Sequence, residues 1–496
     1  MLITNITSPP TAKQIGLIIK SAAERHRVLY DLYDRYMAGP EGTPIKTREY
    51  YIGSTKQTDK INNKINNDFF GEIIDVKVGF FTGIPIVYDL ERTTYETKKT
   101  VLNTVMDKAR RAIGMAPKPE KEETIVSPQY DKDLAFIRDF NKLNSVADLD
   151  AETAKRASIC GFCGRLLYVE EVTGYLRAIA VNPWECIFVG PSVDVPLYSI
   201  RYYTVIGLDD DGKESKVYKA YLYDAFNVTE FERNDDEEEY KQGKVVRHML
   251  PGNPLIGFAN NDELQGDAEK ELELIDAYDR ALSDVNNEVE QFRLAYMVFS
   301  GAQITGEVMK QAQQTGGFSL TDPNGSVDFI TKKIDDAIIE HHLDRIEANI
   351  YRFSKTPNMK DIQFGSNLTG VAMAFKFRPF EYKCIASELK FKKSLRQQFK
   401  LLSEIWNAKG AKINYLDVDF VFTRNYPQNL LEEAEIQTKL KGVVSDKTRL
   451  ALASFIDDPE QELEDLNNDK ESMMIPPLEQ DDKDNGNGTG AQPVPE

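Results

Sequence analysis

The feature that most constrains the fold is a long, unbroken run of apolar residues at helical spacing. Between residues 267 and 300, steps of three and four residues separate Ile275, Tyr278, Leu282, Val285, Val289, Phe292, Tyr296 and Phe299. This spacing predicts one stripe on a helix, about 50 Å long at 1.5 Å per residue. A returning helix is expected to carry Ile339, Leu343, Ile346, Ile350 and Phe353 on one face. Two such helices have little core of their own, so we expect the hairpin to pack against copies of itself.

The rest of the chain alternates between helical and strand patterns. Helical spacing recurs after the first ten residues and in the stretch NNDFFGEIIDVKVGFFTG. Between about 165 and 250 the pattern changes to short β-rich runs separated by turn residues. A third long helix is expected broadly over 381–408, followed by the alternating strand LDVDFVF and two short helices joined at Gly442. The sequence therefore predicts an α+β fold with a disordered end from about residue 467.

Composition narrows the classes of function. The chain has 496 residues, which suggests roughly two to four structural units. Its four cysteines fit a reducing compartment without a disulfide framework. The formal net charge is −19, and the thirteen acidic residues and two lysines from Asp457 onward account for −11 of it. The remaining −8 argues against a surface that grips nucleic acid by neutralising phosphates. No long apolar run or signal-peptide pattern is found, so we expect a soluble protein made in the cytosol.

One motif has the spacing of a metal or redox site, the CxxC pair Cys160 and Cys163. A structural zinc needs two more ligands, and neither Cys186 nor the four histidines supply them at a suitable spacing. The pair also ends an Ala-rich helical pattern, without the preceding strand of a thioredoxin-like site. We therefore interpret both cysteines as packing residues.

Charged segments of the sequence have simpler explanations than a site. His341 and His342 are adjacent on a helix and point in different directions, which favours a solvated or inter-subunit face. The acidic run at 230–239 indicates an exposed hairpin tip. The third long helix is basic, and a phosphate-facing stripe or pairing with acidic neighbours across a subunit boundary explains it equally well. Its basic residues include Lys383, Lys390, Lys392, Lys393, Arg396 and Lys400.

A glycine-containing loop, FGSNLTGVAMAFKF, separates two of the long helical patterns. Gly365 and Gly370 have the spacing of a phosphate-binding motif, but Val371 and Ala372 stand where Lys and Ser or Thr are required. The sequence also contains no GxSxG, no kinase motifs and no spaced carboxylate cluster. We therefore expect no enzyme, no cofactor and no metal site.

Four stretches, in this order, resemble the portal proteins of tailed bacteriophages, in particular those of long-tailed phages of Gram-positive bacteria. They are NNKINNDFFGEIIDVKVGFFTGIPIVY at 62–88, PLIGFANNDELQGDAEKELELIDAYDRALSDVNNEVEQFRLAYMVFSG at 254–301, the loop with SNLTGVAMAF, and NYPQNLLEEAEI at 425–436. The most characteristic part is LIDAYDRALSD followed by a glycine-rich excursion and then NLTGVAMAF.

The resemblance implies a portal fold that assembles as a ring. Along the chain it implies a wing at 1–262, a first stem helix at 263–300, a clip at 301–333, a second stem helix at 334–353, a tunnel loop at 354–368, a long helix and wing strand at 369–425, a crown at 426–466 and a disordered acidic tail at 467–496. Ring packing is expected from the stem residues Ile275, Tyr278, Leu282, Val285, Val289 and Phe292. The DNA channel is expected at the tunnel-loop residues Lys355, Asn358, Lys360, Gln363, Ser366 and Asn367.

The resemblance also implies the partners. It predicts a ring, typically of twelve subunits, at one capsid vertex of the virion, assembled in the host cytoplasm without a membrane. Double-stranded DNA would pass through it without sequence specificity, packaged by a terminase and later ejected. Head completion or adaptor proteins, the major capsid protein and a scaffolding protein are further expected partners. A mildly acidic body agrees with this function, because weak phosphate contacts let DNA slide.

Two alternatives belong to other classes. One is an enzyme that processes DNA, using the CxxC pair or a metal. The other is a different connector ring component, although such chains are generally shorter and lack the stem and clip excursion.

Overall fold

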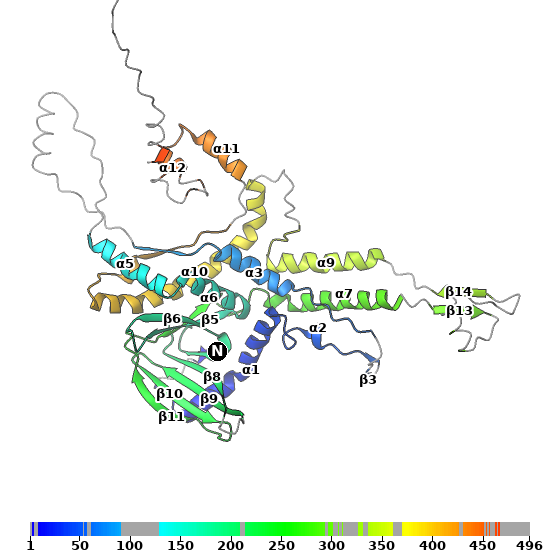
Figure 1. The fold of residues 1–496 in the computed structure, drawn as a ribbon, viewed down its shortest axis with the longest axis horizontal. Coiled ribbons are helices and arrows are strands. Elements are labelled where there is room, and N and C mark those ends of the chain that lie inside the picture. Colours follow the sequence, from blue (N-terminus) through cyan, green and yellow to red (C-terminus); the bar gives the residue numbers. More distant parts are fainter. Residues whose placement is uncertain are drawn as a thin grey trace, which may run out of the picture. The chain divides into compact units, whose positions relative to one another are not determined.

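The computed structural model (Figure 1) describes residues 2–3, 8–52, 54–56, 61–90, 128–208, 214–292, 296–300, 326–330, 336–360, 370–425 and 430–450, and the separate residues 306, 310, 453, 456, 462, 463, 465 and 466. The chain forms two compact units, residues 1–367 with 373–425, and residues 368–372 with 426–496. The predicted disordered tail at 467–496 and most of the predicted clip lie outside the described residues.

The β-rich region folds mainly into a six-stranded sheet in the first unit. Its strands, in spatial order, are β1 (Leu2–Ile3), β7 (Cys186–Val189), β8 (Tyr198–Leu208), β9 (Glu214–Tyr223), β10 (Asn227–Asn234) and β11 (Lys241–Arg247). Neighbouring strands are antiparallel, except β1 and β7, which are parallel. The acidic run at 230–239 covers the turn between β10 and β11, which confirms the predicted hairpin.

Helix α1 (Ala12–Tyr36) packs on this sheet. A capping box begins the helix, because the Gln14 side chain accepts the N–H of Thr11 at 2.9 Å. Its apolar face joins a buried cluster with sheet residues such as Ile187, Val189, Ile200 and Phe231. The predicted N-terminal amphipathic helix is therefore confirmed.

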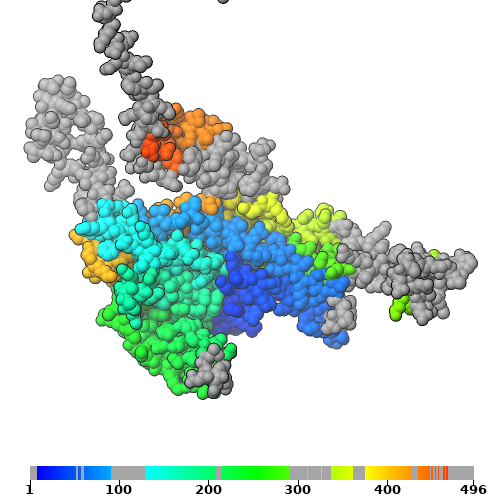
Figure 2. All heavy atoms as spheres, viewed as in Figure 1, coloured from blue at the N-terminus to red at the C-terminus, as the bar shows by residue number. Residues whose placement is uncertain are grey.

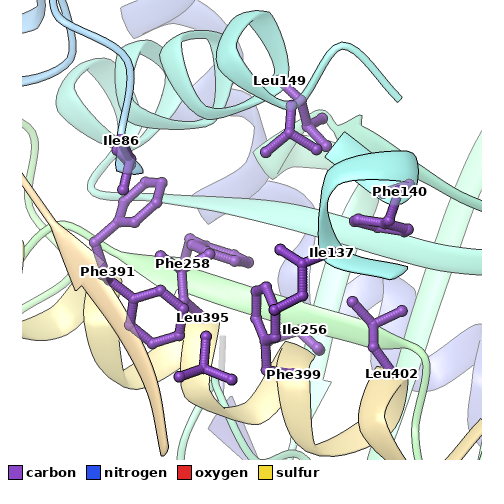
Figure 3. Packing of buried hydrophobic residues seen from close by; sticks show 14 of the residues in the cluster. Ile86, Ile137, Phe140, Leu149, Ile256, Phe258, Phe391, Leu395, Phe399 and Leu402 are labelled. Carbon is purple, nitrogen blue, oxygen red and sulfur yellow. The ribbon is translucent and has the colours of Figure 1, made fainter. Parts of the chain in front are cut away.

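A second, three-stranded antiparallel sheet forms the centre of the first unit. Its order is β12 (Leu255–Ala259), β5 (Phe162–Val169) and β6 (Leu176–Val181). Residues 162–167 are all buried, because helices α6 (Val146–Cys160), α5 (Pro128–Leu143) and α10 (Gly370–Ala408) pack around this sheet. Figure 3 shows Phe391, Leu395, Phe399 and Leu402 of α10 facing Ile256 and Phe258 of β12. The predicted third helix is thus confirmed, and it begins eleven residues earlier than expected.

The predicted helical hairpin consists of α7 (Leu272–Phe292) and α9 (Asp336–Ser354), which run side by side (Figure 1). The expectation that the first helix continues to Ser300 is wrong. Residues Tyr296–Ser300 form strand β13, which pairs antiparallel with β14 (Ser326–Ile330). The sequence YMVFS is aromatic and β-branched, so a cross-strand partner is enough to favour a strand over a further helical turn.

The remaining elements are shorter. In the first unit they are α2 (Pro44–Thr47), β2 (Tyr51–Ile52), β3 (Thr55–Lys56), α3 (Phe69–Phe81), β4 (Val87–Leu90), η1 (Pro183–Glu185), η2 (Glu269–Glu271), η3 (Tyr415–Asp417) and β15 (Val418–Val421). Strand β15 pairs with β4, which confirms the strand predicted for LDVDFVF. In the second unit, α11 (Leu430–Leu440) and α12 (Asp446–Leu450) are joined through Gly442, as expected. Among the described residues, no helix is long and apolar enough to span a membrane.

Candidate functional site

The apolar stripe of α7 has a partner within the chain. It packs toward α9, whose residues Ile346 and Ile350 are buried in the same cluster as Ile275. Of the six predicted ring-packing residues, Ile275 is buried, Tyr278, Leu282 and Val285 are half-buried, Val289 is 53% exposed, and the side chain of Phe292 lies outside the described part of the structure. The outer part of the stripe therefore remains open to a neighbour, while the inner part is covered by α9.

A second face of α7 is polar and yet buried. Asp279 and Ser283 have no exposed surface, and Asn287 retains 7%. Their side-chain oxygens accept backbone N–H groups of the preceding segment at 3.0, 3.0 and 2.6 Å, from Asn67, Ile65 and Asn63 respectively. Alternate residues of an extended chain lie about 6.6 Å apart, and residues four apart on a helix lie about 6.0 Å apart. One polar residue per turn of α7 can therefore accept the N–H of every second residue of the extended segment. The segment thus runs alongside α7.

The first residues of the predicted tunnel loop fold back onto α9. Asn358 Nδ2 and Lys360 Nζ both donate to Glu347 Oε1, at 3.4 and 2.9 Å. Lys355 has a φ of +61°, a left-handed conformation that turns the chain directly after the helix. The other three predicted channel residues, Gln363, Ser366 and Asn367, lie outside the described residues.

A buried ion cluster connects both ends of the helical hairpin to α10. Asp267, five residues before α7, accepts from Lys77 Nζ at 2.5 Å and pairs with Lys383 Nζ at 3.2 Å. The Ser158 hydroxyl also donates to this carboxylate. Lys383 Nζ donates in addition to the main-chain oxygens of Asp267 and Ser354, both at 3.0 Å. Ser354 ends α9, so a single ammonium group of α10 holds the start and the end of the hairpin together.

We call the cluster of Lys77, Asp267 and Lys383 the junction. Burial and ion pairing shift the pKa values of its side chains in opposite directions. Burial raises the pKa of Asp267, but the ammonium groups of Lys77 and Lys383 outweigh it and hold that pKa well below the usual range. Burial lowers the pKa of Lys77, and the Asp267 carboxylate opposes that effect. Asp267 is therefore ionised at neutral pH and acts as the counter-ion of both lysines.

Several basic side chains of α10 pair with acidic residues of their own chain. Lys390 pairs with Asp262, Lys392 with Glu388 at 2.7 Å, and Lys393 with Asp194 at 3.1 Å. Arg396 donates instead to main-chain oxygens, those of Tyr415 and Val418 at 2.7 Å each. Pairing with acidic neighbours is thus the better of the two explanations for the basic helix, although these neighbours lie within the subunit and not across a boundary.

The CxxC residues have the environment of packing cysteines. Cys160 and Cys163 are free and fully buried, like the other two cysteines. Burial raises the pKa of Cys163 to about 11 and that of Cys160 further. Thiols of this kind are protonated at neutral pH and are therefore poor nucleophiles and metal ligands. In the described ranges, no three His, Cys, Asp or Glu side chains gather in a way that could hold a metal ion.

Comparison with known proteins identifies the family. Residues 18–474 match the family described as "Phage portal protein, SPP1 Gp6-like", and the chain belongs to this family. It is 27% identical over 223 residues to the portal protein of Clostridium phage phiCD119, a match of 44% of this chain and 48% of that protein. It is 26% identical over 286 residues to the portal protein of Bacillus phage SPP1, covering 54% of this chain and 56% of the relative. The chain thus spans about half the length of the curated relatives it matches.

Only part of the junction has a signal in the sequence. Lys77 stands in DVKVGFF, inside a helix that is apolar on most sides, and a lysine in such a helix needs a buried partner. Asp267 has no comparable signal, because it lies in a polar stretch that resembles an ordinary surface turn. For Lys383 the sequence shows only that the residue is charged. It does not indicate the three contacts of this side chain, because they come from residues far away in the sequence.

Proposed function

We propose that the chain is one subunit of a ring, typically of twelve copies, that forms the channel for double-stranded DNA at one capsid vertex of a phage. The observation that carries the proposal is the hairpin of α7 and α9, which bears the β13–β14 strand pair beyond its helices (Figure 1). Membership of the portal family supports it, as do the two relatives named portal proteins.

The regions of the subunit follow from this proposal. Residues 1–262 and 369–425 form the wing and long helix, 263–295 and 334–353 the stem, 296–333 the clip, 354–368 the tunnel loop, 426–466 the crown, and 467–496 an acidic tail. Because α7 ends at Phe292, the strand pair β13–β14 belongs with the clip and not with the stem. The clip meets the terminase and later the head completion or adaptor proteins, and the ring contacts the major capsid and scaffolding proteins.

Weak contact with DNA suits this function. The body before the acidic tail carries −8, and Lys383, Lys390, Lys392 and Lys393 of α10 are already paired with carboxylates of the same subunit. A channel built from such subunits offers few free cations to the phosphates, so it neither stalls the duplex nor reads its sequence. The assembled ring would act in the virion after assembly in the host cytoplasm.

Electron micrographs and native mass spectrometry of the purified full-length protein test the proposal. Closed rings with a central channel are expected. A compact monomer at every concentration, measured by light scattering, contradicts ring formation.

The outer stem provides a variant for the same experiment. Val285→Asp combined with Val289→Asp places two charges on the part of the stripe that α9 leaves partly open, and should strongly reduce the yield of rings. Val172→Asp, on a turn where the valine is 95% exposed, is the control and should leave the yield unchanged. Equal yields of rings from the two variants would show that the stem does not lie in the subunit interface.

A further inference from the structure

Helix α10 carries an exposed apolar stripe on the side away from the core. Phe375, Tyr382, Ile385 and Leu389 expose 68%, 62%, 41% and 63% of their surface, and part of the yellow segment that begins α10 is visible at the surface in Figure 2. Buried residues of the same helix point the other way, among them Phe377, Phe380, Cys384 and Phe391. The helix is thus apolar on two sides, and the described part of the chain covers one of them.

The residues of the stripe are spaced so that a second helix can pack against them. Its members follow one another at seven, three and four residues, the repeat of a helix–helix seam. From Phe375 to Leu389 the stripe is about 21 Å long at 1.5 Å per residue. Single exposed apolar residues are ordinary on a protein surface, whereas a continuous row at this spacing marks a contact.

Charge indicates what lies opposite. Helix α10 carries eight basic and three acidic residues, and four of the basic ones, Lys383, Lys390, Lys392 and Lys393, pair with carboxylates of their own chain. Arg378, which is exposed, lies within the stripe itself. The body of a second copy carries −8 before its acidic tail although α10 contributes +5, so the remainder of that body is net acidic and can offer the opposite charge as well as apolar contact. A DNA backbone would match the charge but would leave the four apolar side chains in water.

We infer that the stripe Phe375, Tyr382, Ile385 and Leu389 packs against a helix of a neighbouring copy of this chain. The inference rests on the proposed ring and assigns one of its contacts. In a closed ring each subunit presents two different surfaces, one to each neighbour. The stripe supplies such a surface on the body of the subunit, separate from the outer stem.

A pair of matched variants tests the contact. Leu389→Glu should raise the protein concentration at which half of the subunits are in rings by at least about tenfold, as expected when a packed interface side chain is replaced. Leu416→Glu, at a leucine that is 60% exposed outside the stripe, should leave that concentration unchanged. Both monomers should unfold at the wild-type temperature, since both leucines are exposed.

Thiol labelling gives an independent measurement. All four native cysteines are buried, so Leu389→Cys introduces a readily accessible thiol in the monomer. Its reaction with a maleimide should slow at least about tenfold when dilute monomers assemble into rings, whereas Leu416→Cys should react equally in both states.

The remaining outcomes separate this inference from the proposed ring. Rings in which the thiol of Leu389→Cys reacts as fast as in the monomer overturn the inference and leave the ring intact. If the thiol of Leu389→Cys already reacts slowly in the monomer, the stripe makes a contact within the chain. If Leu389→Glu forms normal rings but capsids with these rings lose their DNA, the stripe faces the channel. Both results contradict the neighbouring-copy contact. Wild-type protein that forms no ring contradicts the proposed function itself.

Discussion

At the residue scale, buried charges hold together elements that are far apart in the sequence. Arg165 has no exposed surface, and it pairs with Asp150 at 2.8 Å and lies 4.2 Å above the ring of Phe258. Tyr88 donates its hydroxyl to the same carboxylate. The junction of Lys77, Asp267 and Lys383 follows the same rule. Such pairs add little net stability but fix one arrangement, because removing one partner leaves a buried charge alone.

The variant Asp267→Asn tests the junction. It removes the counter-ion of two lysines, one of them fully buried, and should lower the free energy of unfolding by about 3–5 kcal/mol. Asp262→Asn, at a carboxylate whose side chain is 81% exposed, makes the same chemical change and should have a much smaller effect, because solvent screens an exposed ion pair. Urea unfolding of both proteins measures the difference, and equal values would show that the junction is not a stabilising contact.

A buried histidine gives the protein a pH dependence. Burial lowers the pKa of His26 from 6.5 to about 4, and its Nδ1 lies 2.5 Å from the Tyr202 hydroxyl. The unfolded chain binds the proton at higher pH than the folded chain does. The contribution is therefore complete above about pH 6.5, and it is lost as the pH falls toward 4, by up to about 3 kcal/mol.

Urea unfolding between pH 7 and pH 4 measures this contribution. His26→Gln should flatten the decline of stability in that window. His341→Gln changes an exposed histidine on α9 and should leave the decline as it is in the wild type. If the free energy of unfolding of His26→Gln declines between pH 7 and pH 4 as steeply as that of the wild type, groups other than His26 cause the decline.

At the element scale, helix α7 is stabilised by an irregular segment as well as by a helix. Its polar residues at every fourth position hold the N–H groups of Asn63, Ile65 and Asn67. These groups would otherwise be buried without a partner or left to water. The segment before α3 is thereby fixed to α7, so this helix is held at several successive turns and not only through the cluster of Lys77, Asp267 and Lys383.

Ser283→Ala tests this anchoring. Ser283 Oγ accepts the N–H of Ile65 at 3.0 Å and has no exposed surface, so its loss should cost about 1–2 kcal/mol. Hydrogen exchange followed by mass spectrometry should show faster exchange at residues 61–67. The exposed Ser215 on β9 provides the control, since Ser215→Ala should leave exchange in that segment unchanged.

At the scale of the whole molecule, the proposed channel separates assembly from the handling of DNA. Residues 361–366 belong to the proposed tunnel loop and follow the contacts of Asn358 and Lys360 with Glu347. A loop that projects into a channel contributes few buried contacts, so under the proposal their deletion should leave ring formation unchanged. Retention of DNA in capsids, measured as nuclease-protected DNA, should fall. Loss of rings without a separate defect in DNA retention would make the loop a structural element.

The sequence by itself determined the local structure and the family. Periodicity predicted α1, α3 and α9, the strands of the larger sheet other than β1, and the two helices around Gly442, because each of these patterns lies within a short stretch of sequence. The sequence also indicated that the cysteines are packing residues, because it shows no further zinc ligands at a suitable spacing from the CxxC pair. All four cysteines are free and buried in the structure. The ordered series of stretches was sufficient to indicate the portal family.

Tertiary structure alone decided where α7 ends and which charges are paired. The apolar stripe continues past Phe292 in the sequence, but strand β14, some 30 residues later, draws residues 296–300 into a sheet. The same holds for Asp267, whose partners lie 190 residues before it and 116 after it. Periodicity reports which side of an element is apolar, whereas the partner of a buried charge or a strand depends on how distant segments meet.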